Sequence, residues 1–195
     1  VIKNATLGAG TLTDASSPTS VSSYRPASYP SDLKDGDQAD VYGAYSRYKD
    51  NGQMRVGWTT DYLPVGVVKI QAARDQASGS VKTQGVVTWT DGKDNVTIQD
   101  DTAGIAVYAR GKASAFNVGD LVVVEGARGA FRDLQQITYA SHTVRGTAEL
   151  PAAQTVTIAD LINTNVAEKY ESERVYVEKA TLGAVNLTGN TPISQ

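Results

Sequence analysis

Short runs of β-branched and aromatic residues, separated by turn-forming residues, make up the middle of the chain. Runs of this length and composition predict strands. Asp91-Gly92 and residues 100–104 supply the Asp and Gly residues that close hairpins between successive runs. The five predicted strands are Val81–Trp89, Val96–Gln99, Gly104–Ala109, Leu121–Glu125 and Gln135–Ala140.

The link between the third and fourth predicted strands narrows the choice of fold type. Gly111–Asn117 is the only stretch there that suits a short helix, and the run Leu121–Val124 that follows it is continuously apolar. Such a run is typical of a strand buried on both faces of a closed barrel. Five short strands with a helical link after the third is the order of the OB fold. A small β-sandwich would give the same strand count.

An internal repeat strengthens the OB interpretation. Residues 33–54 align without a gap on residues 116–137, at a constant offset of 83. The identical pairs are Gly36/Gly119, Asp37/Asp120, Val41/Val124, Gly43/Gly126, Ala44/Ala127, Asp50/Asp133 and Gln53/Gln136. The fourth and fifth strands of a barrel are therefore predicted to occur twice.

A second repeat links the two ends of the chain. Ala5–Ala9 recurs as Ala180–Ala184, so both ends resemble the first strand of a barrel. The C-terminal copy lacks the strands that would complete it. We therefore expect the strand around Val175–Leu182 to pair with a neighbouring sheet edge or with another molecule, such as a second copy of the chain.

These repeats divide the chain into three segments. We predict a first OB-like unit at 1–64, a central OB-fold barrel at 65–149, and a connector with the first strand of an incomplete unit at 150–195. Between Thr13 and Leu33 the first unit has only a Ser- and Pro-rich stretch where the central unit has two clear strands. Either the first barrel is abbreviated there or a loop is missing.

Two connecting stretches predict short helices. Lys69–Gln76 suits one or two helical turns, and Thr157 is a suitable N-cap for a helix over residues 158–162. The predicted fold class is therefore all-β, with tandem small OB-fold-like barrels and short helical connectors.

Composition limits the possible functions. The 195 residues contain no cysteine, which excludes disulfides and thiolate metal sites. The net charge of −3 gives no general attraction to phosphate, so nucleic-acid binding would need a local patch. No apolar run approaches the roughly 18 to 20 residues of a membrane-spanning helix. We see no signal peptide, but the chain opens on Val1 inside a predicted strand, and processing would hide one.

The central and C-terminal segments resemble a known family. The phrases that carry the resemblance are Val81–Thr88, Val96–Tyr108, Val118–Gly126, Leu150–Ala152, Val156–Leu161 and Tyr170–Val175. They are similar to OB-type domains of secreted bacterial nucleases of the endonuclease/exonuclease/phosphatase type and of related Bacteroidetes surface lipoproteins. The resemblance covers roughly Val68 to Gly183. It implies an extracytoplasmic accessory module, secreted or at the cell surface, whose catalytic domain lies elsewhere in the gene.

Catalytic and metal chemistry have few candidates here. His142 is the only histidine, and a triad would need a nucleophile and a carboxylate to converge on it. Asp91, Asp94, Asp100 and Asp101 could bind Ca²⁺ in pairs, but turn formation is the simpler explanation of aspartates at these places. We predict that the chain is not an enzyme and holds no metal or cofactor.

Binding residues are predicted from aromatics of the central unit and from the interleaving of basic and aromatic side chains in the repeated loops between the fourth and fifth strands. An OB fold holds single-stranded nucleic acid by stacking bases on aromatics and by contacting phosphates with Lys and Arg. The same rings could stack on sugars, so a glycan-binding module is an alternative, and a structural spacer or protein-docking unit of a surface assembly is another. The candidates are Tyr45, Arg47, Tyr48, Lys49, Arg55, Trp89, Tyr108, Arg128, Phe131 and Arg132.

Overall fold

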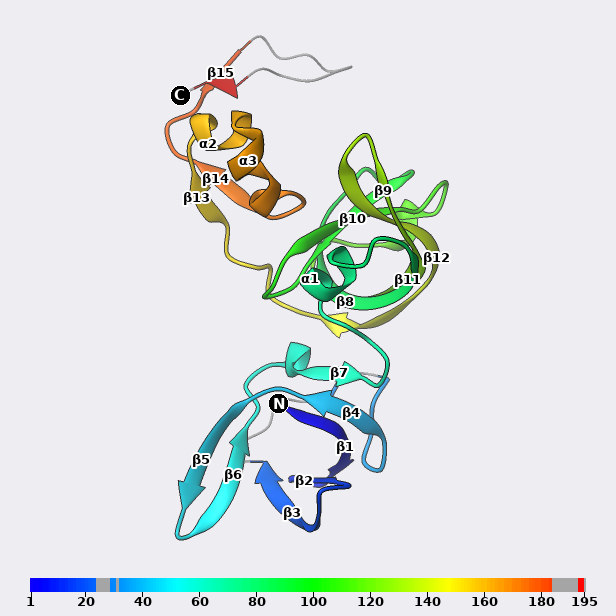
Figure 1. Cartoon of the computed structure of the whole chain (residues 1–195), viewed down its shortest axis with the longest axis vertical. Coiled ribbons are helices and arrows are strands. Elements are labelled where there is room, and N and C mark those ends of the chain that lie inside the picture. Colours follow the sequence, from blue (N-terminus) through cyan, green and yellow to red (C-terminus); the bar gives the residue numbers. More distant parts are fainter. Residues whose placement is uncertain (24–28, 31, 184–192, 195) are drawn as a thin grey trace.

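The chain is an all-β protein in which two OB-type units follow one another and a small helical connector comes last (Figure 1). The computed structural model describes residues 1–23, 29–30, 32–183 and 193–194. The predicted fold class is thereby confirmed.

The central unit is a closed barrel of five strands in the order β10-β12-β11-β8-β9. The strands β10 and β12 are parallel and the other neighbours are antiparallel, as in an OB fold. The bounds are β8 Gly79–Thr90, β9 Asn95–Gln99, β10 Gly104–Tyr108, β11 Asp120–Phe131 and β12 Leu134–Thr147. Every predicted central strand is confirmed, and a short 3-10 helix, Ala113–Ala115, lies in the predicted link.

The core of the central barrel explains its apolar sequence pattern. Valine and isoleucine side chains from all five strands are buried together inside it. The helix α1 (Ile70–Arg74) adds Ile70 and Ala73 to the same core, so the predicted helical turn closes the barrel rather than only leading into it. Phe116 adds an aromatic ring from the link before β11.

The first unit forms a seven-stranded sheet in the order β5-β6-β3-β2-β1-β4-β7. Its pairings repeat those of the central barrel: β1 is antiparallel to β4 as β8 is to β11, and β3 is parallel to β6 as β10 is to β12. The strands β4 and β5 are two parts of one strand, interrupted at residues 42–43. The bounds are β1 Ile2–Gly8, β2 Thr11–Asp14, β3 Ser17–Ser23, β4 Gln38–Val41, β5 Ala44–Tyr48, β6 Asn51–Arg55 and β7 Tyr62–Pro64, with a 3-10 turn at Thr59–Asp61.

The Ser- and Pro-rich stretch of the first unit contains strands that the sequence did not predict. The strand β3 reads Ser-Pro-Thr-Ser-Val-Ser-Ser and has a single large apolar residue, Val21, so it shows no alternation. It forms because β2 and β6 pair with its two edges. Residues 24–28 and 31, in the rest of this stretch, lie outside the described residues.

The repeated residues occupy equivalent places in the two units. A Cβ atom at Gly126 would overlap the carbonyl oxygen of Thr138, and at Gly43 it would stand 2.5 Å from the carbonyl oxygen of Arg55. Both glycines therefore let the neighbouring strand approach closely. Gly36 and Gly119 also correspond, with φ of 91° and 94°, a region that side chains disfavour.

The repeated aspartates cap the same turn in both units. The carboxylate of Asp37 accepts a hydrogen bond from the backbone N–H of Lys34 (2.9 Å), and Asp120 accepts one from the N–H of Asn117 (3.1 Å). The N–H of each aspartate returns a bond to the carbonyl of the same partner. This two-way turn explains why Gly-Asp occurs at both places.

The connector pairs with itself. The strands β13 (Gln154–Val156) and β14 (Val175–Val177) are parallel, and β15 (Thr181–Leu182) pairs with β16 (Ile193–Ser194). The segment Val175–Leu182, predicted to pair with a sheet edge, thus pairs with strands of the same chain. Pairing with a second copy of the chain stays a prediction. Between β13 and β14 lie α2 (Ile158–Ile162), α3 (Thr164–Ala167) and a 3-10 turn, Glu168–Tyr170. The predicted Thr157 cap is confirmed as a capping box with Asp160.

A buried arginine joins the two OB-type units. The guanidinium of Arg145, on β12, donates to a carboxylate oxygen of Asp32 (2.7 Å), to the carbonyl of Tyr62 (2.7 Å) and to the side chain of Gln84. Burial lowers the pKa of Arg145, an effect that Asp32 opposes. An apolar cluster adds to the contact: Leu63, Val67 and Val123, with Tyr42.

Candidate ligand-binding surfaces

Two β-hairpins present most of the predicted binding residues, and their turns have the same backbone geometry. Lys49-Asp50 connects β5 to β6, and Arg132-Asp133 connects β11 to β12. All four residues have positive φ, at 47°, 65°, 50° and 71°. This is the conformation of a type I′ turn, which Asn-Gly or Asp-Gly normally supplies. Each turn therefore holds non-glycine residues in a sparsely populated region, at a cost of about 1 kcal/mol per residue.

The same two hairpins place a cation over an exposed ring. The Nζ atom of Lys49 lies 5.3 Å from the ring centroid of Tyr48, and the Cζ atom of Arg132 lies 5.3 Å from that of Phe131. Tyr48 is 60% exposed and Phe131 59%. We call residues 48–50 and 131–133 the hairpin tips. Each tip offers an aromatic ring, a cation and an aspartate in the same order.

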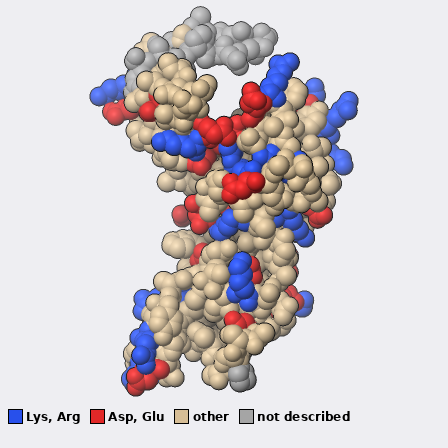
Figure 2. All heavy atoms as spheres, viewed as in Figure 1, with Lys and Arg blue, Asp and Glu red and all other residues tan. Residues whose placement is uncertain are grey.

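The β5–β6 hairpin adds side chains on both of its faces. From the pairing register, Tyr45 and Arg47 share one face, and Tyr48 and Arg55 share the other. Tyr45 is 71% exposed. Figure 1 shows this hairpin extending away from the central barrel, and Figure 2 shows basic and acidic atoms side by side at its end.

Trp89 and Tyr108 lie on the central barrel, away from its hairpin tip. Trp89 is exposed where a register shift interrupts the pairing of β8 with β9, and Tyr108 is partly exposed at the end of β10. The strand β9 separates the two strands that carry them. The structure therefore does not gather all the predicted residues on one surface.

Arg128 is not available to a ligand, so its prediction as a binding residue is wrong. Its side chain is buried, with the residue 7% exposed. It donates to the carbonyls of Ala73 (3.1 Å) and Arg74 (2.9 Å) at the end of α1, and also to Gly129 and Gln135. The sequence could not indicate this burial, because the helix that covers Arg128 lies more than fifty residues before it.

The residues weighed for catalysis have structural partners. The imidazole of His142 stacks on Phe116 at 4.0 Å between centroids, and its Nδ1 lies 3.0 Å from the hydroxyl of Tyr139. Burial lowers the pKa of His142. This is a packing role at the end of the barrel.

The aspartates form turns, as the sequence suggested. One oxygen of Asp91 accepts the backbone N–H groups of Lys93, Asp94 and Asn95, and these bonds hold the pKa of Asp91 far below its usual range. Asp100 caps α1 by accepting the N–H of Ile70 (2.9 Å). Within the described residues, no group of three His, Cys, Asp or Glu is placed to hold a metal ion.

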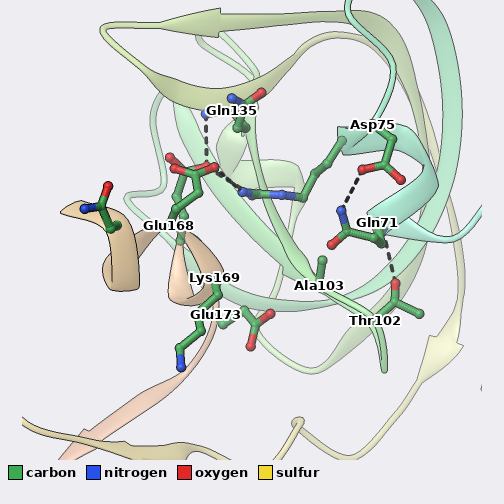
Figure 3. A pocket seen from close by; sticks show the side chains of 11 residues that line it. Gln71, Asp75, Thr102, Ala103, Gln135, Glu168, Lys169 and Glu173 are labelled. Atoms are coloured by element: carbon green, nitrogen blue, oxygen red, sulfur yellow. Dashed lines mark hydrogen bonds and ion pairs between the residues drawn. The ribbon is translucent and has the colours of Figure 1, made fainter. Parts of the chain in front are cut away.

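A charged pocket of about 480 Å³ lies between the central barrel and the connector (Figure 3). Arg74 lies across it and donates to Glu168 (2.9 Å), to Glu171 (3.0 Å) and to the carbonyl of Gly104 (2.9 Å). Glu171 also accepts the N–H of Gln135 (3.1 Å). The pocket's charges thus fasten the connector to the barrel, and we assign it a structural role.

A larger cleft of about 830 Å³ lies between the two OB-type units and the start of the connector. The indole of Trp58 borders it and is 70% exposed. Sequence reasoning missed this residue, because Trp58 lies outside the repeat and has no neighbouring motif. The exposure of Trp58 beside a cleft, which marks it as a candidate binding residue, is evident only in the folded chain.

Comparisons with known proteins add little. No family model matches the chain, and no curated protein matches it. Among solved structures, the chain is similar to the hypothetical protein ygiW from E. coli, at 17% identity and a TM-score of 0.35 over 40% of this chain and 88% of that one. A likeness of this size carries no argument about function. None of the helices in the described part of the chain is long and apolar enough to cross a membrane.

Proposed function

We propose that this chain is a non-catalytic OB-type module that binds single-stranded nucleic acid through its two hairpin tips. The observation that carries the proposal is the correspondence of the tips. Both hold an exposed ring and a cation in a turn whose backbone favours glycine. Strained backbone of this kind is retained where something other than stability selects it.

The chemistry of the tips suits an unpaired strand. The exposed rings of Tyr48 and Phe131 offer faces on which bases stack, and Lys49 and Arg132 can contact the adjacent phosphates. Because the net charge of −3 gives no general attraction to phosphate, such binding depends on local cations like these. On the face drawn in Figure 2, basic and acidic side chains alternate rather than forming one basic band.

The wider setting of the module follows from the family resemblance alone. On that basis we propose an extracytoplasmic location and a catalytic domain elsewhere in the same gene. The chain itself would then hold the substrate strand near a separate active site. Glycan binding and a spacer or docking role are the competing outcomes of the binding test.

The test is binding of a fluorescently labelled oligothymidylate across a salt series. Replacing Lys49 and Arg132 together by Ala should reduce the slope of log K against log salt by ~0.7 for each phosphate that the variant no longer neutralises. Replacing Tyr48 and Phe131 by Ala should weaken binding about tenfold or more with little change of slope. Lys34→Ala is the control, because it removes an exposed lysine that lies outside both hairpin tips.

Two results would contradict the proposal. One is the absence of binding even at low salt. The other is equal binding by the tip variants and the wild type. No binding of the oligonucleotide together with binding on a glycan array would favour the glycan alternative. No binding in either assay would favour the spacer or docking role.

A further inference from the structure

The cleft between the two units is open to solvent and has the size of a ligand site. Its volume of about 830 Å³ falls within the range of small-molecule pockets. Its walls come from β7 and the turn before it in the first unit, from β8 and β9 of the central barrel, and from residues 147–154. The cleft is thus distinct from the hairpin tips and needs both units.

The carboxylate of Asp61 holds the loop that carries Trp58 in place. One carboxylate oxygen of Asp61 accepts the backbone N–H groups of Gly57 (3.0 Å) and Trp58 (3.0 Å). The N–H of Asp61 in turn donates to the carbonyl of Trp58 (3.0 Å). These bonds fix the loop, so the exposed indole is a preorganised flat surface at the border of the cleft.

The floor of the cleft combines apolar side chains with amides. Val86 and Leu121 are buried there, next to the buried amides of Gln84 and Gln99. The Oε1 atom of Gln99 accepts the N–H of Arg174 (2.9 Å), while its Nε2 atom has no hydrogen-bond partner among the described residues. The floor thus offers both an apolar surface and a hydrogen-bond donor.

The charges of the cleft select against ionic ligands. Lys69 is the single basic residue among those lining it, and it is paired with Asp101 (2.5 Å), so a phosphate-bearing ligand would meet mostly carboxylates. Four of the five carboxylates that line the cleft already have partners. Asp61 holds the Trp58 loop, Asp100 caps α1, Asp101 pairs with Lys69, and Glu173 accepts a bond from the amide of Gln154. A cationic ligand would therefore gain little from them.

A neutral molecule with flat apolar faces and many hydroxyl groups satisfies all of these conditions. Its ring stacks on an indole, and its hydroxyl groups exchange hydrogen bonds with amides and with a carboxylate such as that of Glu149, which has no partner among the described residues. We propose that the cleft binds a neutral oligosaccharide, with Trp58 as the stacking platform. This site is independent of the nucleic-acid function proposed above.

The two walls of the cleft are held at a fixed separation. Arg145 joins Asp32 and Tyr62 of the first unit to Gln84 of the central barrel, and Gln84 also donates to the carbonyl of Thr60 (3.3 Å). Binding then needs no closure of the units. A preformed site loses less freedom when the ligand binds.

Fluorescence provides a direct test, because the chain has only two tryptophans and Trp58 is the one at the cleft. In the full chain carrying Trp89→Phe, all indole emission comes from Trp58. The probes are cellohexaose, xylohexaose, laminarihexaose, mannohexaose and maltohexaose, chosen after a screen on an array of neutral glycans. We expect a saturable change of emission with at least one of them.

Variants assign the response to the cleft. Trp58→Ala should weaken binding of that oligosaccharide about tenfold or more in calorimetry, whereas Trp89→Ala, which removes the other exposed indole, should leave it unchanged. Glu149→Ala should weaken it several-fold. Because all three side chains are exposed, circular dichroism should show unchanged folding.

Three outcomes would overturn the inference. They are no binding of any neutral glycan, equal affinity of Trp58→Ala and the wild type, or an emission change with tetra-arginine or oligothymidylate in place of the sugars. The double variant of Lys49 and Arg132 should bind the oligosaccharide normally. Its result separates this site from the hairpin tips.

Discussion

The fourth strand of the OB fold occurs twice in this chain, and the two copies differ at one revealing position. Arg128 of the central barrel and Tyr45 of the first unit are equivalent by the repeat. Arg128 is buried against the end of α1, whereas Tyr45 is 71% exposed on a hairpin that projects from its unit. No helix covers the position of Tyr45 in the described part of the first unit.

The hairpin tips change far less than the strands that carry them. The turn keeps its basic residue, its aspartate and its positive φ in both copies, and the ring remains exposed. The strand below is a continuous part of a closed barrel in one unit and is broken at residues 42–43 in the other. The difference shows that the tip geometry does not depend on how the rest of the strand packs.

The largest expected effect comes from breaking the link between the units with Arg145→Met. It removes the buried guanidinium that bonds Asp32, Gln84 and the carbonyl of Tyr62, which should lower the free energy of unfolding by about 3 kcal/mol. Trp58 and Trp89 report on the first and central units separately. In the variant, the urea unfolding transitions reported by the two tryptophans should have different midpoints. Coincident, unshifted transitions would contradict this, and Lys34→Ala is the control for an exposed ion pair.

Adding a side chain at the two equivalent glycines should have effects of equal or smaller size. Gly126→Ala forces a Cβ into the carbonyl of Thr138 inside the closed barrel and should cost about 3 kcal/mol. Gly43→Ala meets the carbonyl of Arg55 in an exposed hairpin that can move aside, so we expect about 1 kcal/mol. Thermal unfolding measures both. Equal losses would show that the first hairpin is as constrained as the second.

Substitutions at the equivalent positions 128 and 45 should separate effects on stability from effects on binding. Arg128→Met removes the guanidinium donor from the carbonyls of Ala73 and Arg74, of which the Ala73 carbonyl keeps the N–H of Gln76 (3.3 Å). The change should cost about 2 kcal/mol, with no change in oligothymidylate affinity. Tyr45→Ala should leave the melting temperature within about 1 °C. It should weaken that affinity less than Tyr48→Ala does, because Tyr45 lies outside the hairpin tip on the opposite face of the hairpin. A loss of affinity in a folded Arg128→Met protein would restore Arg128 as a binding residue.

Relieving the strained turns should stabilise both units by a smaller amount. Changing Lys49-Asp50 to Asn-Gly supplies the preferred residues of a type I′ turn and should add about 1 kcal/mol to the free energy of unfolding. The same change at Arg132-Asp133 should add a similar amount. Both variants should bind oligothymidylate more weakly. Stabilisation without loss of binding would remove strain as an argument for function.

The smallest effect is a pH dependence confined to the central barrel, which holds the only histidine. Burial lowers the pKa of His142 in the folded state, so the unfolded chain binds a proton first as pH falls. Stability is complete above the unfolded value of about 6.5 and declines as pH falls through it toward the folded pKa. The melting temperature should thus drop between about pH 7 and pH 5 in the wild type and less in His142→Phe.

Much of the architecture could be predicted from the sequence, because it depends on local signals. Short β-branched and aromatic runs bounded by turn residues located the five central strands, and Thr157 located α2. The repeat identified residues that turned out to share a physical cause, such as Gly43 and Gly126 at a close strand contact. The hairpin tips also followed from sequence, since a turn places its own residues.

Tertiary structure decided what no local signal carries. It placed polar β3 between two partners, buried Arg128 under a helix distant in sequence, and left Trp58 exposed beside a cleft that exists only where two units meet. Each depends on contacts between segments far apart in the chain. The sequence alone thus determined the order of strands and the two hairpin tips, whereas the packing of one unit on the other decided which side chains remain free to bind.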